Sequence, residues 1–230
     1  DRDMEIANFI PKSYFEIEGN FKSPNGNYKG KYIKGKESKF DTIEDANKII
    51  DSITSNKGII IDKKVTTSKE YAPKLFSLTS LQGFITSKYS NFTSDKVLSA
   101  CQSLYEGKGK GGYITYPRTD SIYLEESLVS KVSQTLDKIK VGLPYENKIS
   151  FTKSKRIFDS SKVDSHSAII PTYIIPSNLS SDEQIVYNAI KDRFIANFMP
   201  PAEYENTEIK TDVDKHIFLT KGKVLKIKGY

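Results

Sequence analysis

The sequence predicts an α+β protein with more than one domain, in which an all-β domain built from both ends of the chain carries an inserted, mainly helical domain. Three observations predict this class. The first 73 residues contain short runs of alternating apolar and polar positions, as half-buried strands do. Apolar residues then recur at helical spacing. Strand-like alternation returns after Pro201, so the predicted domains are 1–73 with 202–230, and 74–201.

The strands of the β domain are predicted from alternation that turn residues interrupt. A short helix from about Thr42 to Ile53 is expected among the first strands. In the final segment, Lys221-Gly222 is predicted as a hairpin turn. The predicted strands are 14–21, 31–33 and 58–61, with a turn at 24–27, and then 208–213, 216–220 and 224–227.

The predicted helices are recognised by their ends. Ser94 is the expected N-cap of a helix that ends at Gly107, and its apolar positions are Val97, Cys101, Leu104 and Tyr105. A second amphipathic helix is predicted from Leu124 to Ile139. Ser180 and Glu183 form a capping box for a third helix, which Pro200-Pro201 stops.

Composition limits the possible classes of protein. The net charge is +6, and residues 74–201 hold 16 of the basic and 12 of the acidic side chains, so a modest basic excess permits nucleic-acid contact. A single cysteine, Cys101, excludes an internal disulfide and a four-cysteine zinc site. No apolar run is long enough for a membrane span, and no secretory leader is visible. We therefore expect a cytoplasmic protein without membrane contact, and the start at Asp1 suggests a piece of a longer chain.

One segment carries a pattern suited to phosphoryl transfer. Residues 112–121 read Gly-Tyr-Ile-Thr-Tyr-Pro-Arg-Thr-Asp-Ser, which places Tyr116 two residues before one of only four arginines, Arg118. In an extended segment these two side chains share one face. A phenol has an ordinary pKa near ~10, so a tyrosine that attacks a phosphodiester needs positive charge beside the developing oxyanion. Arg118 is positioned in the sequence to supply that charge, and Pro117 favours the extended geometry.

This segment resembles the active-site motif of the type IA DNA topoisomerases, and the proline after the tyrosine resembles their topoisomerase III branch. A second block, His166-Ser167-Ala168-Ile169-Ile170-Pro171-Thr172, is similar to the family's downstream histidine motif. Weaker matches surround both blocks, and the resemblance covers nearly the whole chain. These matches are Leu78-Thr79-Ser80-Leu81-Gln82, Gln102-Ser103-Leu104-Tyr105-Glu106, and 198–205.

The resemblance implies a fold, a reaction and a set of residue roles. The β domain would be the arch of the topoisomerase ring, and Tyr116 would form a 5′-phosphotyrosine bond with single-stranded DNA. Arg118 would stabilise phosphoryl charge and His166 would hold the phosphate. Thr119 and Asp120 would support this geometry. The resemblance also implies Mg²⁺, expected on an acidic domain outside these 230 residues, a monomeric state, and no nucleotide hydrolysis; RNA stays open as a second substrate.

Other interpretations of the same residues stay open. Thr119 and Asp120 are equally typical of an Asx-type turn, and Lys108 and Lys110 suit either a DNA-backbone contact or a solvated loop. Asp212-Val213-Asp214 indicates an exposed strand end rather than a metal site. For the whole chain, the main alternative is a non-catalytic single-strand-binding or hinge module. A tyrosine recombinase is less favoured, because the other arginines do not cluster around Tyr116.

Overall fold

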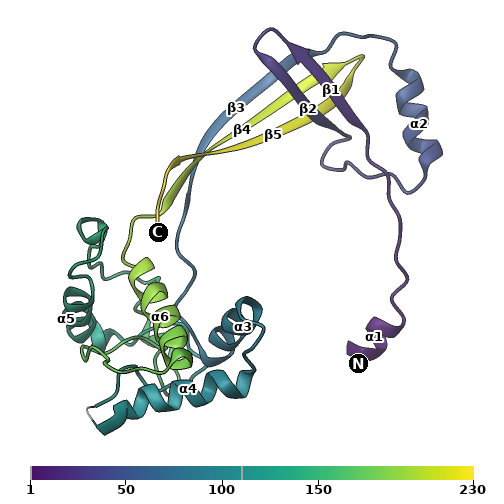
Figure 1. The fold of residues 1–230 in the computed structure, drawn as a ribbon. Coiled ribbons are helices and arrows are strands. Elements are labelled where there is room, and N and C mark those ends of the chain that lie inside the picture. Colours follow the sequence, from purple (N-terminus) through teal and green to yellow (C-terminus); the bar gives the residue numbers. More distant parts are fainter. Residues whose placement is uncertain (1, 110) are drawn as a thin grey trace. The chain divides into compact units, whose positions relative to one another are not determined.

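The computed structural model describes residues 2–109 and 111–230, and its contacts divide the chain into two units (Figure 1). Unit 1 contains the chain up to Ser68 together with Glu203–Lys226. Unit 2 contains Lys69–Ala202 together with Ile227–Tyr230. Unit 1 is therefore built from the N-terminal part of the chain and a segment near its C-terminus, whereas the last four residues, predicted as part of the β domain, belong to unit 2.

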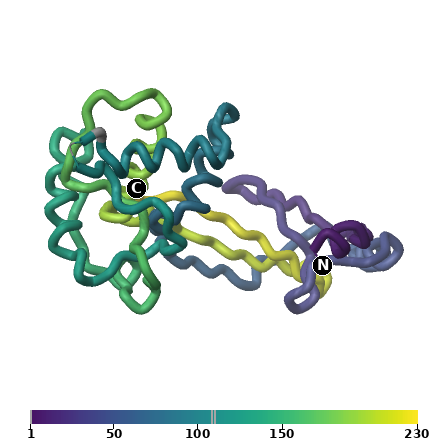
Figure 2. The backbone as a smooth tube through the Cα atoms, turned by 90° about the horizontal axis from the view of Figure 1, so that it is seen from below, coloured from purple at the N-terminus to yellow at the C-terminus, as the bar shows by residue number. Residues whose placement is uncertain are grey.

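Unit 1 is organised around a five-stranded antiparallel sheet in the order β1-β2-β5-β4-β3. Strand β1 pairs with β2, where Phe21 lies opposite Tyr28, and β2 pairs with β5, where Tyr32 lies opposite Phe218. Figure 2 shows β3, β4 and β5 running alongside one another. The strands are β1 (Glu18–Ser23), β2 (Gly26–Ile33), β3 (Ile59–Glu70), β4 (Ala202–Val213) and β5 (His216–Ile227).

The core of unit 1 lies where one face of the sheet meets a helix. Its buried residues are Ile17, Tyr32, Ala46, Val213 and Phe218. Ala46 belongs to helix α2 (Ile43–Ser52), whose N-cap is Thr42, and the Thr42 hydroxyl accepts from the Asp45 backbone N–H. Helix α1 (Arg2–Ala7) buries no residue. Unit 1 therefore contains the helix that was expected from about Thr42 to Ile53, and α1 as a second helix that was not predicted.

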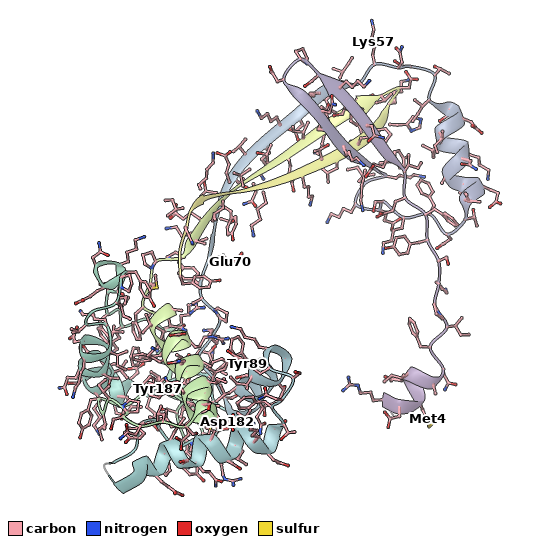
Figure 3. All side chains as sticks on the ribbon, in the orientation of Figure 1. Met4, Lys57, Glu70, Tyr89, Asp182 and Tyr187 are labelled. Atoms are coloured by element: carbon pink, nitrogen blue, oxygen red, sulfur yellow. The ribbon has the colours of Figure 1, made fainter. Side chains whose placement is uncertain are left out.

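Strand β3 buries none of its twelve residues. Figure 3 shows side chains projecting from both faces of the ribbon that β3, β4 and β5 form. A strand that is exposed on both faces gains little from apolar burial, so its backbone hydrogen bonds and cross-strand pairs must hold it.

Two strand predictions were wrong. The first strand begins at Glu18 rather than at residue 14, and Phe15 instead makes an isolated bridge with Phe40. The last hairpin turns at Asp214 and Lys215, which have φ values of 52° and 67°, and β5 runs straight through Lys221-Gly222. Left-handed geometry at both central residues is typical of a type I′ turn, whose twist matches that of paired strands. Lys221-Gly222 therefore lies inside a strand that pairs with β4, not at a turn.

Unit 2 is mainly helical and has two buried clusters. Helix α6 contributes to both, with Val186 and Ile190 in one cluster and Phe194 and Ile195 in the other. Figure 1 shows α6 among the other helices of this unit. The helices are α3 (Leu78–Lys88), α4 (Ser94–Glu106), α5 (Val129–Ile139) and α6 (Ser181–Ala196), with short 3₁₀ turns η1 (Gly107–Gly109), η2 (Glu126–Leu128), η3 (Glu146–Lys148) and η4 (Ser160–Lys162).

The ends of these helices agree closely with local sequence. Ser180 and Glu183 make the predicted capping box. Helix α4 ends at Gly107 with φ 65°, as predicted, but its N-cap is Thr93 rather than Ser94. The predicted helix from Leu124 begins only at Val129, because Leu124 pairs with Phe158 in an isolated bridge. None of the described helices is both long and apolar enough to cross a membrane.

Candidate active site

The tyrosine segment is held between two other parts of unit 2. The Tyr113 backbone N–H donates to Leu104 O at 2.8 Å, at the end of α4. Ile114 forms an antiparallel bridge with Pro171, and the Thr115 N–H donates to Ile170 O at 2.9 Å. Tyr113 and Ile114 are almost fully buried. These contacts fix the backbone immediately before Tyr116, although they form no regular strand.

Burial alternates along residues 116–120, although the backbone turns around Arg118, where the Thr119 N–H donates to Pro117 O at 3.0 Å. Tyr116 is half-buried, Pro117 is buried, Arg118 is exposed, Thr119 is buried and Asp120 is exposed. Inward-facing Pro117 and Thr119 therefore anchor the segment, while the side chains between them remain accessible to a ligand.

The Tyr116 ring lies beside the predicted histidine. The ring centroids of Tyr116 and His166 are 4.4 Å apart, with an angle of 46° between the planes. Tyr105, near the end of α4, meets the Tyr116 ring edge-on at 5.5 Å and 79°. The sequence placed Tyr105 among the apolar positions of a helix and in one of the weaker family matches, but its contact with Tyr116 was not predicted. The two neighbouring rings restrict where the Tyr116 phenol can point.

Thr119 ties the tyrosine segment to the histidine segment. Its Oγ1 donates to His166 O at 2.8 Å and accepts from the Ser121 N–H at 3.1 Å. Its carbonyl oxygen accepts from the Leu78 N–H at 2.9 Å, at the start of α3. Only 7% of Thr119 is exposed, so these bonds are shielded from competing water. Thr119 therefore positions the backbone on both sides of the site.

Arg118 and Asp120 face solvent. Among the described residues, neither side chain makes a hydrogen bond or an ion pair with a protein group. Asp120 consequently does not orient Arg118 in this structure. The Arg118 guanidinium keeps all its donors available, which suits contact with an external anion such as a phosphate.

The glycine-rich loop after α4 holds the two lysines that were predicted to contact DNA. Gly107–Gly109 forms the 3₁₀ turn η1, which contains the backbone of Lys108. Lys110 lies outside the described residues. The predicted backbone contacts of these two lysines stay predictions.

The acidic pair near the chain end has a structural role. Asp214 accepts backbone hydrogen bonds from Thr54 and Ser55 at 2.8 Å and 2.7 Å, and these bonds hold the pKa of its carboxyl below the ordinary value. Asp212 accepts from the Lys215 N–H at 2.8 Å, across the hairpin turn. Within residues 2–109 and 111–230, no group of three His, Cys, Asp or Glu side chains is arranged to hold a metal ion.

Comparison with known proteins gives the family of the chain. A family model described as DNA topoisomerase matches residues 1–230. The chain belongs to the type IA DNA topoisomerase family. It is 30% identical to DNA topoisomerase 3 of Bacillus subtilis over 237 residues, and 31% identical to DNA topoisomerase 3 of Staphylococcus haemolyticus over 239 residues. Both alignments cover the whole chain and 32% of the relative, so the chain spans about a third of these topoisomerases.

A solved structure gives the same result for the fold. Full-length topoisomerase I from Thermotoga maritima is similar over 99% of this chain and 36% of that chain, with a TM-score of 0.63 and 25% identity. The family and fold predicted from the two motifs are therefore confirmed. Type IA topoisomerases are isomerases that use Mg²⁺. The His, Cys, Asp and Glu side chains of the described residues offer no group that fits such an ion.

Proposed function

We propose that this chain carries the nucleophile of a topoisomerase III-like enzyme that cleaves and reseals single-stranded DNA. The observation that carries the proposal is the contact between the Tyr116 and His166 rings, with centroids 4.4 Å apart. It brings together the two blocks on which the family resemblance rests. A phenol, an imidazole and an unpaired guanidinium at one surface supply a nucleophile and donors for a phosphate.

The proposed chemistry is an exchange of phosphodiester bonds. Tyr116 Oη attacks the phosphorus, a P–O bond to Oη forms, and the bond to the DNA 3′ oxygen breaks. The phenol loses one proton and the departing 3′ oxygen gains one, so the step consumes neither protons nor nucleotides overall. Attack by the same 3′-hydroxyl reverses the step and reseals the strand. Arg118 stabilises the charge on the phosphoryl oxygens, and His166 holds the phosphate.

Each unit has a proposed part in strand passage. Unit 2 presents Tyr116 to the strand, and unit 1 is the arch that allows the break to open. We also propose that the parent protein acts as a monomer in the cytoplasm. Single-stranded DNA is the proposed substrate, and RNA in place of DNA is a second arm of the assay below.

The test is a search for a covalent adduct. The full-length protein that contains this chain is incubated with Mg²⁺ and labelled single-stranded DNA, or in the second arm with RNA of the same sequence, then denatured and examined by gel and mass spectrometry. We expect a 5′-phosphate on Tyr116 that is lost in Tyr116→Phe. Tyr173→Phe is the matched control, because Tyr173 is an exposed tyrosine that makes no contact with the Tyr116 ring. Retained DNA binding without any adduct would instead favour the non-catalytic binding or hinge module.

A further inference from the structure

A second basic cluster lies beyond the motif. It consists of Lys74, Tyr123 and Lys162, and we call it the Tyr123 cluster. The Lys162 Nζ lies 3.5 Å from the Tyr123 hydroxyl oxygen and 4.8 Å from the centre of its ring. The Lys74 Nζ lies 4.5 Å from the same ring centre. Two ammonium groups therefore flank one half-buried phenol.

The positive charge of the Tyr123 cluster is only partly balanced. Lys162 has one carboxylate nearby, Asp159 at 3.7 Å. In the described part of the chain, Lys74 has no carboxylate partner, and its Nζ instead donates to Arg156 O at 2.7 Å. The two lysines hold the pKa of the Tyr123 phenol below its ordinary value, and Lys162 has the larger effect. A fixed excess of positive charge beside a hydroxyl donor favours binding of an anion.

The Tyr123 cluster is connected to the candidate active site through the backbone. The Tyr123 carbonyl oxygen accepts from the Ala168 N–H at 2.8 Å, two residues after His166. The Tyr123 N–H donates to Ser121 Oγ at 3.1 Å, and the Ser121 N–H donates to Thr119 Oγ1. The bonds that position the histidine thus also position the cluster.

We propose that Lys74, Tyr123 and Lys162 bind a second backbone phosphate of the same nucleic-acid strand, at a linkage other than the one that Tyr116 attacks. This inference rests on the proposed function. The ligand is a phosphodiester rather than a stacked base, because the ammonium groups lie over the Tyr123 ring where a base would stack. The Tyr123 hydroxyl and both ammonium groups donate to its oxygens. Such a contact fixes the register of the strand relative to Tyr116.

The experiment measures binding of the full-length protein to single-stranded oligonucleotides at several salt concentrations. Lys74→Gln and Lys162→Gln should each weaken binding about three- to ten-fold, and the double variant should reduce the slope of log K against log salt by ~0.7, the value for one lost phosphate contact. Tyr123→Phe removes a donor but no charge, so binding should weaken about two-fold with the slope unchanged. The matched control is Lys88→Gln, because the exposed Lys88 also lies over an aromatic ring, that of Phe84 at 5.5 Å.

A second readout locates the contact on the strand. Oligonucleotides that carry one neutral methylphosphonate linkage at successive positions are compared with the unmodified strand. With the unaltered protein, one linkage besides the cleaved one should weaken binding when it is neutral. In the double variant Lys74→Gln/Lys162→Gln that position should no longer matter, whereas in Lys88→Gln it should matter as before.

The outcomes separate this inference from the proposed function. Adduct formation on Tyr116 is followed with the same oligonucleotide. If the adduct forms but the double variant keeps the position dependence and salt slope of Lys88→Gln, the inference is wrong and the proposed function stands. If the unaltered protein forms no adduct, the proposed function is wrong, and the inference falls with it.

Discussion

Thr119 provides the sharpest test of how the site is held together. Thr119→Val replaces the hydroxyl with a methyl group of similar shape, so packing is conserved while two hydrogen bonds are lost, to His166 O at 2.8 Å and from the Ser121 N–H at 3.1 Å. At about 1 kcal/mol for each bond, the loss is about 2 kcal/mol. Expressed wholly in the cleavage step, this corresponds to a rate about 30-fold lower.

The assay compares three variants of the full-length protein. We expect Thr119→Val to slow adduct formation on Tyr116 by about ten-fold, which accounts for about 1.4 kcal/mol, and to lower the free energy of unfolding by the remaining ~0.6 kcal/mol. Thr119→Ser keeps the hydroxyl and should restore most of the rate. Thr86→Val is the matched control, because the Thr86 hydroxyl bonds only to carbonyl oxygens of its own helix, that of Gln82 at 2.8 Å and of Gly83 at 3.5 Å.

Two results would refute this reasoning. If Thr119→Val forms the adduct as fast as Thr86→Val, the bond to His166 O does not position the site. If Thr119→Ser is as slow as Thr119→Val, the lost hydroxyl is not the cause, and the methyl group of Thr119 matters instead.

The remaining predictions concern stability. Gly107→Ala should cost about 1 to 2 kcal/mol in urea denaturation, because φ is 65° and a Cβ would lie 3.1 Å from Gly112 N, whereas Gly83→Ala, within α3 with open space around it, should be neutral or stabilising. Burial raises the pKa of the Cys101 thiol from 9.0 to about 12. The folded state then holds a proton that the unfolded state loses, so stability should fall as pH rises above about 9, by at most about 1.4 kcal/mol per pH unit, and Cys101→Ala should lack this loss in alkaline denaturation. The lowered pKa of Asp214 affects stability in the opposite direction. The stability that its carboxylate contributes is present above the ordinary pKa of 3.8 and is lost as pH falls. Unfolding of Asp214→Ala, followed by circular dichroism, should therefore depend less on acid pH.

The fold was predictable where a local rule decides the structure. The Ser180 capping box and the left-handed Gly107 each determine a helix end through contacts with near neighbours. Helix α3 was not predicted, because Leu78–Lys88 is rich in Ser and Thr and has only two buried residues, Leu81 and Ile85. Its formation depends on packing against distant segments, which overrides weak propensity. The false turn at Lys221-Gly222 has a similar cause, since β4 continues to pair with β5 beyond that point.

The site was predictable only in its motif residues. Tyr116, Arg118 and His166 were singled out from two short blocks, and their roles stay predictions. The extended geometry expected from the i+2 spacing is interrupted, because the Thr119 N–H donates to Pro117 O at 3.0 Å and closes a turn around Arg118. The Tyr105 ring and the Tyr123 cluster could not be predicted. Each depends on segments that are far apart in sequence, and lysine beside tyrosine has no sequence signature at such separations.

The pairing of β2 with β5 has a consequence for synthesis on the ribosome. Tyr32 and its partner Phe218 are 186 residues apart, by subtraction of their positions. At about 5 to 20 residues per second, the β1–β2 hairpin waits about 10 to 40 s for its neighbour to be translated. During that time one edge of the hairpin is open to wrong partners, and Lys31 on that edge, which later lies opposite Leu219, places a charge that discourages them. The nascent chain therefore completes its helical segment before its sheet.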